Sequence, residues 1–266
     1  MTTTPGLLPH TSTARRMLNK VPEVTLWFWV IKILATTVGE TFADFLNLTL
    51  GFGLNGTSVV MGALLAIALV AQFRLHRYVP WVYWLSVVLI SVVGTLITDN
   101  LTDNAGISLV TTTTIFALAL AATFATWFAS ERTLSIHTIH STRREAFYWL
   151  TILFTFALGT AAGDLVAERL NVGFLLSALL FASLIAAAAI AHYGFKVSAV
   201  LTFWMAYILT RPLGASLGDY LSQQPADGGL GLGTTVTSVL FLLTILGVVT
   251  YLSVTKRDHA DPVAVR

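Results

Sequence analysis

Four stretches of this chain share one pattern: FWVIKILATTVGETFAD (28–44), YWLSVVLISVVGTLITD (83–99), YWLTILFTFALGTAAGD (148–164) and FWMAYILTRPLGASLGD (203–219). Each stretch opens with Phe or Tyr followed by Trp, has a glycine ten residues after the tryptophan, and ends with a small residue and an aspartate. The tryptophans are spaced 55, 65 and 55 residues apart. Self-similarity at a regular spacing predicts four tandem copies of one structural unit.

The composition indicates that most of the surface is not exposed to water. Of the 266 residues, 56% are hydrophobic and only 11% are charged, whereas an average soluble domain is about one quarter charged. Apolar runs of about 20 residues match the ~30 Å of hydrocarbon in a bilayer. We therefore predict an all-α membrane protein, because a helix satisfies its own backbone hydrogen bonds in lipid. Its eight transmembrane helices are expected at 24–48, 57–74, 80–102, 107–129, 145–169, 173–193, 197–221 and 232–254.

Lysine and arginine predict the orientation of these spans. One side of the map holds Arg15, Arg16, Lys20, Arg74, Arg77, Arg132, Arg143, Arg144, Lys196, Lys256, Arg257 and Arg266. The other side has Arg169 as its only base. Positive charge favours the cytoplasm, so both termini are expected there. The predicted organisation is a cytoplasmic tail (1–22), a single membrane domain (23–256) with repeats at 23–78, 79–143, 144–198 and 199–256, and a second tail (257–266).

Every copy enters the membrane from the same side, so the four two-helix repeats are parallel rather than inverted. The strongly charged residues within the spans all lie on the first helix of a repeat, and they are Lys32, Glu40, Asp44, Asp99, Asp164, Arg211 and Asp219. Because charged side chains avoid lipid, we expect the odd-numbered helices to be inner and the even-numbered helices to be outer.

The tryptophan and the glycine that recur in every copy of the pattern have structural interpretations. Trp29, Trp84, Trp149 and Trp204 are expected to be interfacial aromatics at the level of the lipid headgroups. The glycines, followed four residues later by another small residue, let two helix backbones approach closely. Gly39, Gly94, Gly159 and Gly214 are therefore the predicted packing positions.

The four aspartates are the candidate site. An ionised carboxylate in a membrane helix costs up to about 3 kcal/mol, and folding does not require four of them. We predict that Asp44, Asp99, Asp164 and Asp219, with Glu40, form an ion or proton site. Oxygen ligands suit hard cations such as Mn²⁺, Mg²⁺ and Ca²⁺. The chain has no cysteine and only four methionines, which disfavours copper and zinc.

Two further groups of residues are expected to support this site. Lys32 and Arg211 are counter-charges in the first and last copies, and each lies too far along its own helix from an acid to pair with it there. Thr57, Thr112 and Ser177 each follow an aspartate by 13 residues. Their hydroxyls either line the site or cap the even-numbered helices, and the sequence leaves both interpretations open.

The repeated unit resembles a bacterial family of membrane proteins defined by a tandem repeat of unknown function with a characteristic tryptophan, often labelled membrane-anchored. The resemblance covers residues 20–255, including the stretch from Lys32 to Glu40. It implies a multi-pass protein of the bacterial inner membrane with eight helices, and it implies no activity.

Function is therefore predicted from the residues. The leading hypothesis is a transporter of a hard cation, or of a small substrate coupled to protons, that uses the ring of aspartates. The alternative is a structural or partner-binding membrane protein whose aspartates form hydrogen bonds between helices. No catalytic or phosphate-binding motif is present, so neither an enzyme nor a cofactor is predicted beyond a candidate divalent cation. The expected partners are the lipid bilayer and an ion or small molecule, not nucleic acid, and no oligomeric state is predicted.

Overall fold

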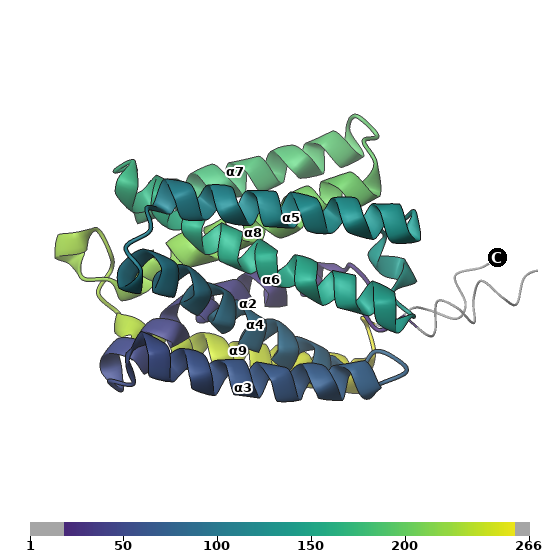
Figure 1. The fold of residues 1–266 in the computed structure, drawn as a ribbon, viewed down its shortest axis with the longest axis horizontal. Helices are drawn as coiled ribbons and strands as arrows, with labels where there is room; N and C mark the ends of the chain where they lie inside the picture. Colours follow the sequence, from purple (N-terminus) through teal and green to yellow (C-terminus); the bar gives the residue numbers. More distant parts are fainter. Residues whose placement is uncertain (1–18, 259–266) are drawn as a thin grey trace, which may run out of the picture.

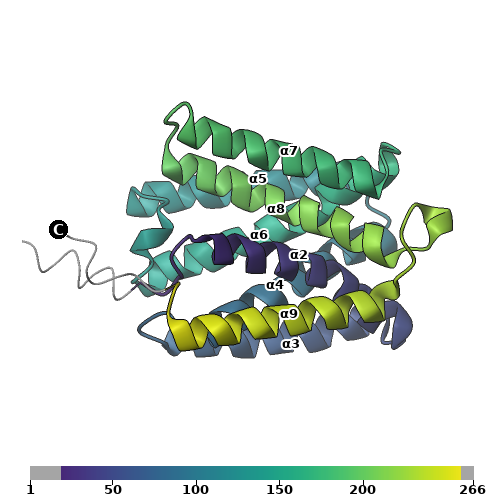
Figure 2. The ribbon, with the colours of Figure 1, turned by 180° about the vertical axis from the view of Figure 1, so that it is seen from behind.

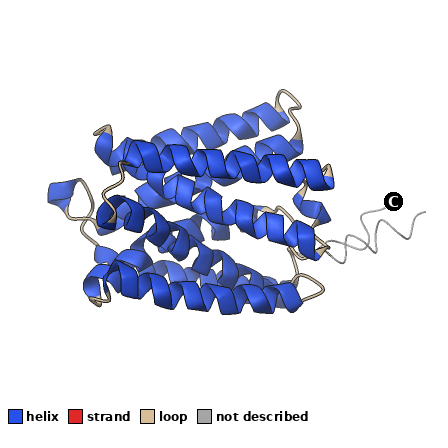
Figure 3. Ribbon diagram, in the orientation of Figure 1, coloured by secondary structure: helices blue, strands red, loops and turns tan. Residues whose placement is uncertain are grey.

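The computed structural model describes residues 19–258, so most of the predicted tails 1–22 and 257–266 lies outside the described residues. The described part is helical and contains no β-strand (Figure 3). Its long helices are α2 (Leu26–Asp44), α3 (Gly53–Arg74), α4 (Pro80–Asp99), α5 (Leu109–Glu131), α6 (Thr142–Asp164), α7 (Phe174–Tyr193), α8 (Ala199–Ser222) and α9 (Gly233–Thr255). These eight helices correspond to the eight predicted segments.

Seven of these helices are long and apolar enough to cross a membrane. The exception is α8, which has the required length but carries Arg211 in its middle and is less apolar. The prediction of a helical protein that is apolar enough for a membrane is thus confirmed.

Four helices form the centre of the bundle. Helix α2 packs against α4, α4 against α6, α6 against α8, and α8 against α2, which closes a ring. More than half of the residues in α2, α4, α6 and α8 are buried. In the other four long helices only about a quarter are buried. In Figures 1 and 2 these four helices lie between a lower pair, α3 and α9, and an upper pair, α5 and α7.

The outer helices connect neighbouring copies of the repeat. Helix α3 packs on α4, α5 on α6 and α7 on α8, so each second helix contacts the first helix of the following repeat. The last of them, α9, packs on α2 and joins the fourth copy to the first. Each copy therefore buries its apolar surface only with the help of its neighbours, as in other repeat proteins.

The pattern glycines are the points where the inner helices touch. A Cβ atom added at any of them would overlap the neighbouring helix. The contacts are Gly39 with Ser91, Gly94 with Phe156, Gly159 with Arg211, and Gly214 with Thr36. Each partner lies seven residues after the tryptophan of the next copy, so one contact occurs four times around the ring. The predicted packing role of these glycines is confirmed.

Three of the inner helices are α-helical up to the pattern aspartate, and after it they continue as a wider π-helical turn. Five-residue π-helical turns, η1 (Phe45–Thr49), η2 (Asn100–Asn104) and η4 (Leu165–Arg169), follow Asp44, Asp99 and Asp164. Short 3₁₀ turns, η3 (Ile136–Thr138) and η5 (Pro225–Asp227), lie in the loops. We call this end of the bundle the aspartate end. The end formed by loops 75–79, 132–141 and 194–198 is the arginine-rich end.

The arginine-rich end is closed by residues that were predicted to be tails. Residues 19–22 are buried there rather than forming part of a free tail, and Lys20 Nζ lies 2.6 Å from Glu145 Oε2. Asp258, assigned to the second tail, is also buried. The hydroxyl of Tyr78 donates to Asp258 Oδ2 at 2.5 Å. Burial and the Asp258 carboxylate raise the pKa of Tyr78, which keeps this donor protonated.

Candidate functional site

Arg211 lies on α8 at the centre of the ring and is completely buried. Its Nη1 donates to the carbonyl oxygen of Thr36 at 2.6 Å. Its Nη2 lies 3.0 Å from Glu40 Oε2, in an ion pair with α2. The same nitrogen donates to Thr160 Oγ1 of α6 at 2.7 Å and to Thr95 Oγ1 of α4. One guanidinium therefore connects all four inner helices.

The repeat explains why these side chains meet. Glu40, Thr95 and Thr160 each directly follow the pattern glycine of their copy, and the equivalent residue of the fourth copy is Ala215. Arg211 of α8 thus pairs with an acid of another helix, Glu40 of α2, as expected from its distance to the acid on its own helix. Thr95 and Thr160 were not predicted as site residues. Their equivalence to Glu40 in the repeat was the signal that could have identified them.

Lys32 is the second buried base. It is completely buried, and its Nζ has no hydrogen-bond partner among residues 19–258. The ammonium group lies 4.0 Å from the ring centroid of Phe156 and 4.1 Å from that of Tyr207. Such cation–π contacts stabilise a desolvated cation by about 2 kcal/mol. Among residues 19–258, no acidic side chain pairs with Lys32.

The four pattern aspartates occupy the ring at the aspartate end. Asp44, Asp99 and Asp164 are half-buried, and Asp219 is 6% exposed. Across the described residues, no side-chain hydrogen bond or ion pair involves any of these four carboxylates. Asp44, Asp99 and Asp164 are thus partly accessible, whereas Asp219 is buried.

Glu40 lies within electrostatic reach of all four aspartates. Asp103 and Glu168 add further negative charge to this end. Such a concentration of carboxylates attracts cations. However, no group of three or more acidic or histidine side chains within 19–258 converges closely enough to hold a metal ion. The predicted acids therefore share one end of the ring without forming a ready-made metal site.

The hydroxyls of Thr57, Thr112 and Ser177 neither line a water-accessible site nor cap the even-numbered helices. Thr57, Thr112 and Ser177 are completely buried, so no water-sized space lies beside them. They also do not cap their helices, since the N-cap residues are Phe52, Ser108 and Gly173. The predicted hydroxyls lie one turn further along each helix, and none of the three has a hydrogen-bond partner among the described residues.

This arrangement leads to a prediction about stability. Replacing Thr57 and Thr112 by valine keeps the shape of each side chain and removes an unsatisfied hydroxyl, so each change is expected to stabilise the fold by about 1 kcal/mol. The measurement is the melting temperature in detergent. Thr237→Val is the control, because the Thr237 hydroxyl is equally buried but donates to the Gly233 carbonyl at 2.9 Å. A lower melting temperature for Thr57→Val would contradict the interpretation.

Three of the four pattern tryptophans are buried in the protein core, whereas Trp29 is half-buried. Trp84, Trp149 and Trp204 are at most 4% exposed and belong to the core. Trp204 Nε1 donates to the Leu134 carbonyl at 2.9 Å, and Trp84 Nε1 donates to the Tyr78 hydroxyl at 3.1 Å. Their indole rings also pack against other aromatic residues, Trp149 against Tyr83 and Trp204 against Phe124.

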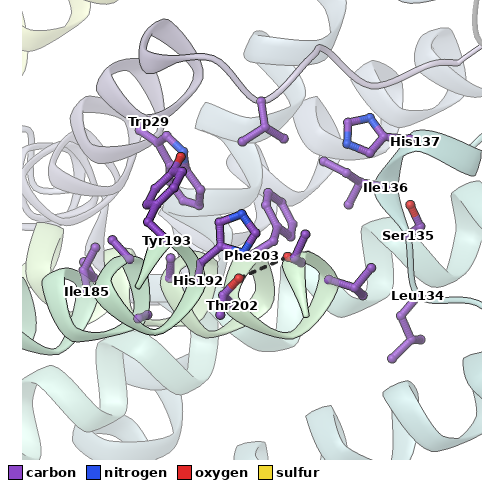
Figure 4. A pocket seen from close by; sticks show the side chains of 16 residues that line it. Trp29, Leu134, Ser135, Ile136, His137, Ile185, His192, Tyr193, Thr202 and Phe203 are labelled. Atoms are coloured by element: carbon purple, nitrogen blue, oxygen red, sulfur yellow. Dashed lines mark hydrogen bonds between the residues drawn. The ribbon is translucent and has the colours of Figure 1, made fainter. Parts of the chain in front are cut away.

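A hollow of about 480 Å³ lies outside the ring at the arginine-rich end (Figure 4). Trp29, His192, Tyr193 and Phe203 form its aromatic side, and alanines of α7 and α8 form its floor. His137 stands at its edge, and its Nδ1 lies 3.5 Å from Glu23 Oε2. None of the predicted site acids lines this hollow.

The fold and the site together define a class: a helical bundle of membrane composition, built from four copies of a two-helix unit around a buried ion pair. A family model described as a repeat of unknown function, DUF347, matches residues 27–78, 82–133, 147–198 and 202–258. These matches cover most of the chain, which therefore belongs to this family. Each match begins two residues before a pattern tryptophan. No curated protein and no solved structure matches the chain.

Proposed function

We propose that this chain is a multi-pass transporter of the bacterial cytoplasmic (inner) membrane, with protons as the driving or transported ion. The apolar outer helices face lipid, and the arginine-rich end faces the cytoplasm by the positive-inside rule. In this orientation both termini are cytoplasmic, the four repeats are parallel, and the aspartates open to the outside. The route runs along the ring of α2, α4, α6 and α8.

The observation that carries the proposal is the order of charges along the ring. Four aspartates that are unpaired within residues 19–258 lie at one end, and the Arg211–Glu40 pair lies directly inside them. Intramembrane acids that have no structural partner are typical of proton and ion pathways. The structural alternative predicted that the aspartates join helices through hydrogen bonds, and in the part of the chain that the structure describes none of them does.

Glu40 provides a mechanism for coupling. When Glu40 takes up a proton from the aspartate end, it loses its negative charge, and the ion pair becomes a contact between the Arg211 cation and a neutral carboxyl group. The guanidinium, which holds α8 to the other three inner helices, is then free to change partners. A proton at one residue can in this way alter the packing of the whole ring, which is the bistable element that a transport cycle requires.

A proton suits this site better than a metal ion. The acids are distributed over four helices and, among the described residues, form no cluster that could hold a metal. Deeper in the ring, Arg211, Thr95 and Thr160 are so fully buried that a hydrated cation has no space beside them. A proton needs only a carboxylate to bind to. A hard cation is the competing substrate. Measuring proton flux and metal-ion flux in the same kind of liposome separates the two.

Neutralising the four aspartates is expected to abolish transport. The variant carries Asp44→Asn, Asp99→Asn, Asp164→Asn and Asp219→Asn, and it is reconstituted in liposomes that contain a pH indicator or an indicator for Mn²⁺, Mg²⁺ or Ca²⁺. The wild type is expected to acidify the liposomes in an outside-acid gradient, and the variant to do so at least about tenfold more slowly, because its side chains no longer accept protons.

Asp227→Asn is the control, since Asp227 is an exposed acid in the loop between α8 and α9. It should leave the flux unchanged. Equal elution of all three proteins from a size-exclusion column establishes that they are folded. If the quadruple variant moved every tested ion as fast as the wild type, the proposal would be wrong.

A further inference from the structure

The hollow at the arginine-rich end (Figure 4) lies where one copy of the repeat lacks two bulky side chains. At 40 and 43 residues after its tryptophan, the second copy has Phe124 and Trp127. Their rings pack edge-to-face against Trp204, with centroids 5.1 and 5.9 Å from that of its ring. At the same two positions the third copy has Ala189 and His192, and both of these smaller residues line the hollow.

The tryptophan beside this space is Trp29. In both cases the tryptophan belongs to the copy two further round the ring, so Trp29 corresponds to Trp204. Trp29 is half-buried, whereas the other three pattern tryptophans are at most 4% exposed. The first copy has Leu69 at the position of Ala189. The hollow is therefore a local departure from the fourfold packing, made by the side chains of the third copy.

Most of the lining is apolar. Ile185 and two alanines of α7 contribute aliphatic side chains, as does Ala206 of α8, and Phe203 adds an aromatic ring. The volume of about 480 Å³ lies within the range of ligand pockets in proteins. Because the hollow is outside the ring, hydrocarbon from a surrounding bilayer can enter it without passing between the inner helices.

The mouth of the hollow has the features of a membrane–water boundary. Tyr193 and Phe195, at the end of α7, are 80% and 77% exposed, and exposed aromatic residues are typical of the headgroup level. His192 Nδ1 lies 3.0 Å from the Val197 carbonyl oxygen. Since a carbonyl only accepts, Nδ1 is the donor, and Nε2, which has no partner within residues 19–258, can bond to an occupant.

The two loops beside the mouth are basic. Loops 132–141 and 194–198 contain Arg132 and Lys196 and no acidic residue. Both bases are exposed, and neither forms an ion pair in the part of the chain that the structure describes. The neighbouring acids already have partners, since Glu23 lies beside His137 and Glu131 lies between two other arginines. Positive charge is therefore left over at the mouth of an apolar hollow.

We propose that this hollow binds one anionic phospholipid from the leaflet at the arginine-rich end. One acyl chain occupies the apolar space beside Trp29, and the phosphate lies at the mouth, between the loops that carry Arg132 and Lys196. Basic pockets between membrane helices are known to bind anionic headgroups. The start of α8 adds to this attraction, because no side chain caps its first backbone N–H groups. The inference rests on the membrane location in the proposed function but not on transport.

The first test closes the hollow. Ala189→Phe/His192→Trp installs the side chains that the second copy has at these positions. Protein in detergent is mixed with phosphatidylglycerol, which is anionic, or phosphatidylcholine, which is zwitterionic, and retained lipids are counted by native mass spectrometry. The wild type is expected to retain one phosphatidylglycerol and the variant none, while the melting temperature without lipid does not fall. Ala186→Phe is the matched control, because Ala186 is exposed on the same helix and does not line the hollow.

The second test removes the charge at the mouth and leaves the core untouched. Arg132→Gln/Lys196→Gln is expected to raise the Kd for phosphatidylglycerol at least about tenfold, and to leave the Kd for phosphatidylcholine unchanged. The control is Lys256→Gln, since Lys256 is an exposed base at the same end of the bundle but follows α9. This variant should bind phosphatidylglycerol as the wild type does.

Two results would overturn the proposal. One is equal retention of phosphatidylglycerol by the wild type and the closed variant, and the other is equal affinity of the wild type for the two lipids. If the closed variant aggregates, the charge variant decides, and an unchanged Kd refutes the site. The proposed function is tested separately by ion flux in liposomes. Retention of the lipid by a protein that moves no ion would leave this site standing and the transporter proposal refuted.

Discussion

Replacing Arg211 with leucine is expected to lower the free energy of unfolding by about 3–5 kcal/mol, because the change leaves Glu40 as a buried carboxylate without its counter-charge. It also removes the hydrogen bonds from one guanidinium to α2, α4 and α6. The measurement is the shift of the unfolding transition in detergent, followed by tryptophan fluorescence during an SDS titration. In liposomes the same variant is expected to transport nothing, since the charge switch is absent.

Arg143→Leu is the matched control for this prediction. The side chain of Arg143 is 69% exposed and lies 3.5 Å from Glu131 Oε1, a surface pair that contributes less than about 1 kcal/mol. The double variant Arg211→Leu/Glu40→Leu should regain part of the lost stability, because no unpaired charge remains in the ring. Equal stability of Arg211→Leu and Arg143→Leu would show that the central pair does not hold the ring together.

Replacing Gly214 with valine is expected to prevent closure of the ring between its first and fourth copies. A Cβ at this position would overlap the Thr36 side chain of α2, and both backbones are held in place by their neighbours. Overpacking by one methyl group typically costs 1–3 kcal/mol, so Gly214→Ala should lower the melting temperature measurably. The larger Gly214→Val should yield aggregated protein on a size-exclusion column.

Two other helical glycines distinguish crowding from a general effect of valine on helices. A Cβ at Gly62 of α3 or at Gly247 of α9 would meet nothing within 4 Å. Gly62→Val and Gly247→Val should therefore elute as the wild type does, with little change in melting temperature. If all three variants behaved alike, close helix contact at the pattern glycines would not be what assembles the ring.

The local features of the fold were readable from the sequence because they depend on neighbouring residues. The segment predicted at 80–102 is the helix that begins at Pro80, whose fixed φ favours the first helical position. Packing at the pattern glycines was also predictable, since only a residue without a Cβ allows two backbones to touch. The burial of Trp84, Trp149 and Trp204 was not predicted, because an indole suits a protein core as well as a lipid headgroup region, and residue type alone does not distinguish the two.

The pairing of side chains within the site was not predictable. Arg211 lies 171 residues from Glu40 in the chain, and a guanidinium can bond to an acid, a hydroxyl or a carbonyl oxygen with similar geometry. Which of these surrounds it depends on the angle and register of four helices. The repeat placed Glu40, Thr95 and Thr160 at one level of the ring. Arg211 lies one helical turn closer to the tryptophan of its own copy, and the repeat did not indicate that its side chain would reach all three.

The sequence by itself determines that each of the four two-helix units has one aspartate. It also places this aspartate near the end of a membrane-length helix, because spacing along a helix is set by the rise per residue. Only the tertiary structure decided that, within residues 19–258, the aspartates stay unpaired while Glu40 pairs with the arginine, and that Lys32 lies against aromatic rings. The physical reason is that pairing a buried charge depends on distances between helices, which arise when the ring closes and α9 returns to α2.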